Sequence, residues 1–182
     1  MQRAIVTPAI LPSAALAELK QWLAITSTRE DAALTQLLRA ALDMCEGFTR
    51  AVPLETTYEE VLPAASGWQV LGLNPVRSIT GVQGIAADGA RFAVPAGQYR
   101  IDITFDQIGQ VSLINASGAA RIAVTYTAGL AATWDTLPAA LRHGLIRLAA
   151  FHFRARETDP GRAVPPSAIS ALWQPFRRMR LA

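Results

Sequence analysis

The side chains that most often carry out chemistry are sparse in this chain, which has two histidines and one cysteine. His143 and His152 lie nine residues apart, on opposite sides of a predicted helix, and no cysteine or acidic cluster joins them at zinc-site spacing. Cys45 falls on the apolar side of another predicted helix, and buried thiols are usually inert. These residues therefore predict neither a metal site nor a nucleophile.

Glycines and carboxylates give no stronger candidates. Residues 81–84, Gly-Val-Gln-Gly, lack the lysine and the following helix of a phosphate-binding loop, and no serine lies in a nucleophile elbow. Asp102 and Asp106 could be imagined as a carboxylate pair, but Asp102 alternates with inward-facing apolar residues and is expected to point to solvent. We therefore predict no catalytic residue, no cofactor and no enzymatic activity.

Length and composition predict one domain with its own core, with or without a small appended piece. The chain has 182 residues, about half of them apolar, which suffices for a core without disulfides or metals. One cysteine excludes an internal disulfide framework and fits a reducing compartment. No stretch approaches the roughly 18 apolar residues of a membrane span, and the N-terminus does not resemble a secretory signal. We expect a soluble protein, made in a cytoplasm, with no membrane partner.

Charge is distributed unevenly along the sequence. Residues 142–182 contain eight arginines and two acidic residues, whereas residues 1–141 contain nine basic and twelve acidic residues. A basic end on a mildly acidic body indicates an anionic partner, either nucleic acid or an acidic protein surface.

Helical periodicity marks both ends of the chain. A short helix is predicted over residues 14–23 with Ser13 as its cap, and a longer one begins at the capping-box pair Ser27 and Glu30 and stops at Pro53. A third helix follows Pro138 and runs to about Glu157. The third is apolar on two sides, which is typical of a helix that is central or shared with a neighbouring subunit.

Between these helices the sequence has short alternating runs and frequent turn signals. The alternation at residues 99–103 and 121–127 predicts half-buried antiparallel strands, about six in all. The predicted class is α+β: a small helical bundle with an inserted antiparallel sheet or sandwich. The predicted parts are N-terminal helices in 1–53, a β insertion in 54–133, a long helix in 134–160 and a C-terminal tail in 161–182.

The tail is the most informative segment, because large apolar side chains alternate with arginines there. Three apolar anchors, at roughly 1.5–3 kcal/mol each, cannot offset the entropy of ordering about 15 residues. The tail must therefore pack on its own body or dock on a partner. The docking candidates are Leu172, Trp173, Phe176, Arg177, Arg178, Arg180 and Leu181.

The order of these elements resembles the head–tail adaptor (connector) proteins of long-tailed bacteriophages and gene transfer agents. The likeness spans nearly the whole chain, and none of its motifs is chemically distinctive alone. The segments that carry it are residues 16–23, 30–50, 73–79, 88–89, 124–130, 137–157 and 171–181.

The resemblance implies a structural protein of the virion that assembles as a ring, of twelve copies, beneath the portal. It implies that the C-terminal segment docks on the portal protein and that the opposite face receives the next tail-completion (stopper) protein. DNA would pass through the ring without sequence-specific binding. Aromatic and arginine residues, frequent interface anchors, suit such docking.

Two other functions remain open at this point. A nucleic-acid-binding protein would use the same arginines on phosphates and bind with a steep salt dependence. The acidic body disfavours this hypothesis. A small hydrolase or carbohydrate-active module depends on the β region alone, for which no catalytic residue can be named.

Overall fold

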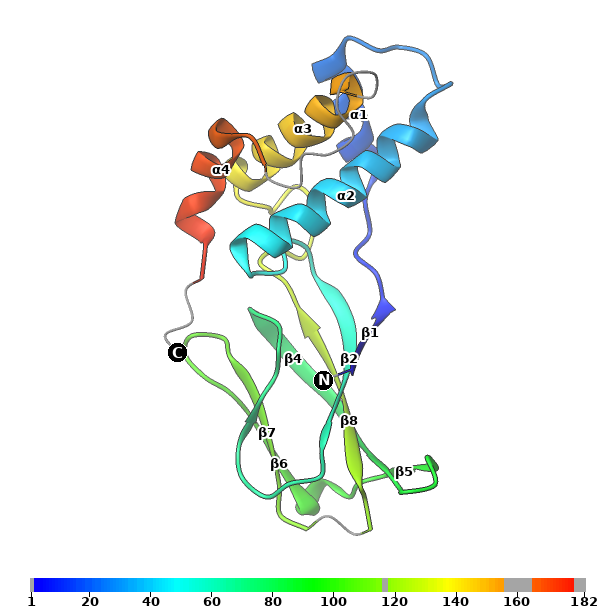
Figure 1. Ribbon diagram of the computed structural model, residues 1–182, viewed down its shortest axis with the longest axis vertical. Coiled ribbons are helices and arrows are strands. Elements are labelled where there is room, and N and C mark those ends of the chain that lie inside the picture. Colours follow the sequence, from blue (N-terminus) through cyan, green and yellow to red (C-terminus); the bar gives the residue numbers. More distant parts are fainter. Residues whose placement is uncertain (1, 116–117, 156–164, 179–182) are drawn as a thin grey trace. The chain divides into compact units, whose positions relative to one another are not determined.

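The computed structural model describes residues 2–115, 118–155 and 165–178, which form two compact units (Figure 1). The β unit comprises Met1–Ala9 and Glu55–Leu130, and the helical unit comprises Ile10–Leu54 and Ala131–Ala182. Helices and antiparallel strands thus segregate, which confirms the predicted α+β class.

The β unit contains two antiparallel sheets. The larger has the order β1-β2-β8-β4-β5 and the smaller the order β3-β7-β6. The strand bounds are β1 Gln2–Thr7, β2 Thr56–Pro63, β3 Gln69–Val70, β4 Val76–Ile85, β5 Arg91–Ala93, β6 Tyr99–Ile103, β7 Gly109–Leu113 and β8 Arg121–Ala128; the single-turn helix η1, Ala96–Gln98, precedes β6.

The core of the β unit lies around β8, the central strand of the larger sheet. Ile122, Val124 and Tyr126 are fully buried there, as their alternation predicts. The carboxylate of Glu60, on the neighbouring β2, is also buried, and its Oε2 accepts hydrogen bonds from Tyr126 Oη (2.8 Å) and from the backbone N–H of Gly72 (2.9 Å). A buried carboxylate with two donors joins β2, β8 and the loop after β3.

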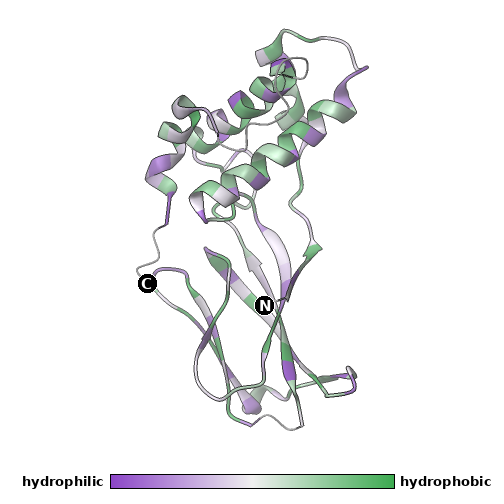
Figure 2. Ribbon diagram, in the orientation of Figure 1, coloured by the Kyte–Doolittle hydropathy of each residue, from purple (hydrophilic) through white to green (hydrophobic). Residues whose placement is uncertain are grey.

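The helical unit is built from α1 (Ser13–Leu23), α2 (Asp31–Thr49), α3 (Ala139–Arg154) and α4 (Ser167–Trp173), followed by the short helix η3 (Gln174–Phe176). Helix α3 packs against α1, α2 and α4, so both of its apolar sides are covered within the chain. Of the two settings predicted for this helix, a central one is therefore observed. Figure 2 shows apolar and polar residues alternating along α2 and α3, as expected for amphipathic helices.

Several sequence predictions are wrong in detail. Helix α1 starts at Ser13 itself, with Pro12 as N-cap and no side-chain cap, and α2 starts at Asp31 rather than at Ser27. The hydroxyl of Ser27 instead accepts a hydrogen bond from the backbone N–H of Arg29, a local turn that competes with helix initiation. The described residues form eight strands, not six.

Strands β1 and β6 differ most from prediction. Residues 1–53 were predicted to belong with the helices, but Gln2–Thr7 pairs with β2 in the larger sheet. In β6, residues Arg100 to Ile103 are exposed on both faces, so the predicted half-burial fails. Both strands are edge strands, with a neighbouring strand along one edge only. Fewer side chains therefore surround them and bury their own side chains.

Candidate functional site

The C-terminal segment predicted to dock on a partner is described as far as Arg178. Within it, Trp173 is fully buried, Leu172, Phe176 and Arg178 are half-buried, and Arg177 is exposed. Arg180 and Leu181 lie outside the described residues. The seven candidates thus differ widely in how accessible they are.

Trp173 belongs to the core of the helical unit. Its Nε1 lies 3.4 Å from the carbonyl oxygen of Leu141, to which it donates a hydrogen bond, and its ring centroid lies 6.1 Å from that of Phe48. The indole rests on α3 at Gly144, where an added Cβ would overlap Trp173 Nε1. Trp173, at the end of α4, is therefore buried against α2 and α3 of its own unit.

The two arginines after Trp173 close on the C-terminal end of α2. The Arg177 guanidinium lies 5.6 Å from the centre of the Phe48 ring, and the backbone N–H of Arg178 donates to the carbonyl oxygen of Thr49 at 2.9 Å. Cations near a helix C-terminus interact favourably with its partial negative charge. Of the two predicted alternatives for the tail, packing on its own body thus describes residues 167–178.

The residues considered for catalysis are spread over several elements of the structure. Cys45 is buried, and burial raises the pKa of its thiol to about 12, so the group stays protonated near neutral pH. Gly81 and Gly84 lie within strand β4 rather than in a loop. Asp102 points to solvent as predicted and accepts a hydrogen bond from Gln110 Nε2 at 2.9 Å. Within the described ranges, no group of three His, Cys, Asp or Glu residues could hold a metal ion.

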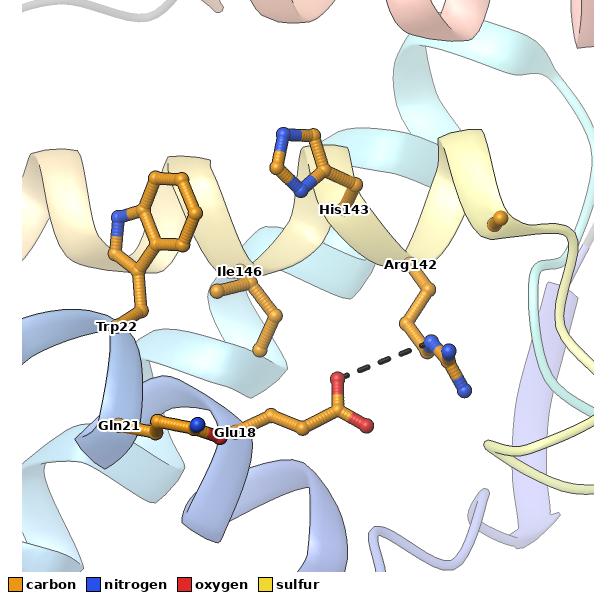
Figure 3. A pocket seen from close by; sticks show the side chains of 7 residues that line it. Glu18, Gln21, Trp22, Arg142, His143 and Ile146 are labelled. Atoms are coloured by element: carbon orange, nitrogen blue, oxygen red, sulfur yellow. Dashed lines mark ion pairs between the residues drawn. The ribbon is translucent and has the colours of Figure 1, made fainter.

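A groove of about 670 Å³ between α1 and α3 contains the exposed His143 and was missed by the sequence analysis (Figure 3). The ring of Trp22, itself half exposed, meets His143 edge to face at 5.3 Å between centroids. Beside them, Arg142 Nε lies 3.8 Å from Glu18 Oε2, so the two charges at the groove offset each other. His152, on the other side of α3, contacts Phe151 instead.

The carboxylate that lines the groove is already engaged by other side chains. Glu18, its carboxylate, already pairs with Arg142 and accepts a hydrogen bond from Trp134 Nε1 at 3.2 Å. No signal in the sequence distinguishes Trp22 from a core tryptophan, since it lies on an amphipathic helix beside Leu19 and Leu23. In the described part of the chain, no helix is long and apolar enough to cross a membrane.

Comparison with solved structures places this chain beside components of gene transfer agent (GTA) particles. It is 27% identical to a chain in the neck of an empty GTA particle computed with C6 symmetry, with a TM-score of 0.77. It is 27% identical to a chain of the native GTA virion (TM-score 0.74) and 26% identical to one in the native neck computed with C12 symmetry (TM-score 0.74). Each alignment covers 100% of this chain and 98% of the other. No protein-family model and no curated protein matches the chain significantly. The full-length likeness confirms the resemblance drawn from the sequence. It also confirms the prediction of a structural, non-enzymatic protein at the particle neck.

Proposed function

We propose that this chain, a structural protein of the head–tail connector type located at the head–tail junction of a phage-like particle, is the adaptor subunit. In this role, about twelve copies form a ring beneath the portal protein, the next tail-completion protein binds the opposite face, and DNA passes through the ring.

The observation that carries the proposal is the full-length match to chains of particle necks, which covers the helical unit and the β unit alike. Necks computed with C6 and C12 symmetry support repeated copies around an axis, and twelve is the larger of the two symmetries. The mildly acidic body suits a channel that lets DNA slide, because it offers few cations to the phosphates.

We assign portal docking to the basic end of the chain, chiefly to the residues that follow Trp173. Trp173 is buried in its own unit and acts as an anchor that holds the segment against α3. The remaining docking candidates are Leu172, Phe176, Arg177, Arg178, Arg180 and Leu181, of which Arg177 is exposed in the structure. Their cationic groups suit an acidic surface on the portal.

Two truncations separate docking from folding. Deleting residues 166–182 removes Trp173 from the core and should destabilise the helical unit, so a loss of portal binding by this variant would be uninformative. Deleting residues 179–182 keeps Trp173 and the Arg178 backbone hydrogen bond to Thr49, and removes Arg180 and Leu181. The shorter deletion should leave thermal stability unchanged while weakening portal binding at least tenfold.

The measurement is the mass of the purified full-length chain and of the 179–182 deletion, each alone and mixed with purified portal protein at low and moderate salt. A multi-copy complex formed by the full-length chain and weakened by the deletion supports the proposal. Equal binding by both would refute a role of Arg180 and Leu181 in docking. Absence of any portal complex, together with salt-sensitive binding to DNA, would favour the nucleic-acid-binding alternative.

A further inference from the structure

The hairpin formed by β6 and β7 exposes an unusual row of apolar side chains. Ile101 is 45% exposed, Ile103 is 37% exposed, and Phe105, in the turn after β6, is fully exposed. Ile101 and Ile103 alternate with Arg100 and Asp102, so these two isoleucines lie on one face of the strand, and Phe105 follows in the turn. Neighbouring exposed apolar side chains of this kind often mark an interaction surface.

The backbone of β6 is open along the same row. The N–H of Ile114 donates to the carbonyl of Gln98, and the N–H of Thr104 donates to the carbonyl of Ile108, so the even-numbered residues direct their backbone groups toward β7. The backbone N–H and C=O groups of successive residues point to opposite edges of a strand, so the groups of Ile101 and Ile103 point away from β7. Strand β6 is last in its sheet, and no described strand pairs with its far edge.

The turn that presents Phe105 is firmly held. The N–H of Gln107 donates to the carbonyl of Thr104 (2.8 Å), and the N–H of Ile108 donates to the Thr104 hydroxyl (3.2 Å). The N–H of Val76, at the start of β4, donates to the carbonyl of Gln107 (2.8 Å). The exposed position of Phe105 is therefore built into the hairpin.

The β unit has a second open edge of similar length. Strand β1 ends the larger sheet, and its side chains are exposed from Arg3 to Thr7, with Ile5 61% exposed. Its register with β2 is regular as far as Ile5 and irregular from there to Thr7. The remaining sheet ends, β3 and β5, have two and three residues, against six in β1 and five in β6.

We propose that the open edge of β6 in one copy pairs with the open edge of β1 in the next copy, so that strand addition joins neighbouring subunits of the ring. This inference rests on the proposed function. Two different edges on one protomer make a head-to-tail contact, the kind that repeats around a ring. Main-chain hydrogen bonds supply affinity in such pairing, and apolar side chains supply specificity.

Charge and composition support a second copy as the occupant. β1 contributes the cation Arg3, while the β6 segment contributes Asp102 and Asp106 against Arg100. Neither strand contains the lysine or proline residues by which many sheet edges avoid pairing. Pairing would also cover Ile5 on one copy together with Ile101 and Ile103 on the other.

Cysteine cross-linking in purified particles tests the contact. The variant Ile5→Cys/Ile101→Cys is treated with a short bis-maleimide and run on a denaturing gel; the native Cys45 is buried and stays unreacted. We expect a ladder of multimers. The matched control is Ile5→Cys/Val70→Cys, because Val70 is a similarly exposed residue (46%) on the opposite edge of the same small sheet, and it should give no ladder.

Backbone variants test strand pairing itself. Ile101→Pro removes an N–H that points away from β7, whereas Ile101→Thr keeps the N–H and a β-branched side chain. Carried with Ile5→Cys and Ile103→Cys, the proline should reduce cross-linking at least tenfold and the threonine should leave it within about twofold. Equal cross-linking by both would overturn pairing through the β6 edge.

The two proposals fail in different ways. Particles that contain the protein at the neck but give no ladder with Ile5→Cys/Ile101→Cys, or as strong a ladder with the Val70→Cys control, overturn the strand pairing and leave the adaptor function intact. Particles whose neck lacks the protein overturn the adaptor function and the strand pairing with it.

Discussion

The contact between Trp173 and Gly144 makes a sharp test of how the C-terminal segment is held. The Trp173 indole lies where a Cβ on residue 144 would be, so Gly144→Ala must displace the ring. Removing a buried tryptophan side chain costs about 3–5 kcal/mol, and alanine in place of a mid-helix glycine returns about 0.5–1 kcal/mol. We expect Gly144→Ala to lower the free energy of unfolding by about 2–4 kcal/mol.

Gly47 provides the matched control. It is exposed on helix α2, and an added Cβ there would meet nothing within 4 Å. Gly47→Ala should therefore raise the free energy of unfolding by about 0.5–1 kcal/mol, because alanine reduces the conformational entropy of the unfolded chain. Both variants are compared with the parent by urea unfolding followed by circular dichroism.

A double-mutant cycle identifies the cause. If Trp173 is what the new methyl group strikes, Gly144→Ala should become neutral or stabilising in a Trp173→Ala background. If Gly144→Ala is as stable as Gly47→Ala in the parent, or if its cost persists without the indole, the inferred packing of Trp173 on α3 is refuted.

Three further predictions concern buried and paired groups. Glu60→Ala should cost about 2–4 kcal/mol in urea unfolding, because Tyr126 and the N–H of Gly72 lose their buried acceptor. Arg91 donates a hydrogen bond to Glu59 at 2.6 Å and lowers the pKa of that carboxyl. The pair's small contribution to stability should therefore be present at neutral pH and be lost as the pH falls through the lowered pKa. In Arg91→Ala this contribution should be absent at every pH. Cys45 should react with a thiol reagent only at the rate of unfolding, since burial raises its pKa to about 12; rapid labelling of the folded protein would contradict its placement in the core.

Periodicity predicted the elements that are buried on a regular stripe. Leu34, Leu38 and Cys45 lie on the buried side of α2, and Ile122 and Tyr126 lie in the core of β8, as their spacing indicates. In both elements the tertiary environment repeats with the same period as the backbone, so the sequence pattern carries the information. The fold class follows from the order of such segments.

Local signals were less reliable where tertiary contacts decide. Ser27 and Glu30 have capping-box spacing, yet α2 begins at Asp31, whose carboxylate pairs with Lys20 at 2.7 Å and ties the helix start to α1. The strand β1 is held by main-chain pairing with β2 and buries no regular set of side chains. A strand of this kind leaves no alternation in the sequence to detect.

The exposure of the candidate interaction residues could not be predicted from the sequence either. Large apolar side chains identify interfaces only when they are exposed, and exposure depends on neighbours that the sequence does not name. Trp173 has Gly144 beneath it and is fully buried, whereas Phe105 stands on a hairpin whose far edge has no described partner strand and is fully exposed. Residues with similar chemistry therefore take opposite roles, one as an anchor within the subunit and one on a surface open to another. Substituting Phe105 with serine should therefore weaken the joining of subunits without lowering the free energy of unfolding. Substituting Trp173 should lower the free energy of unfolding before it weakens the joining of subunits.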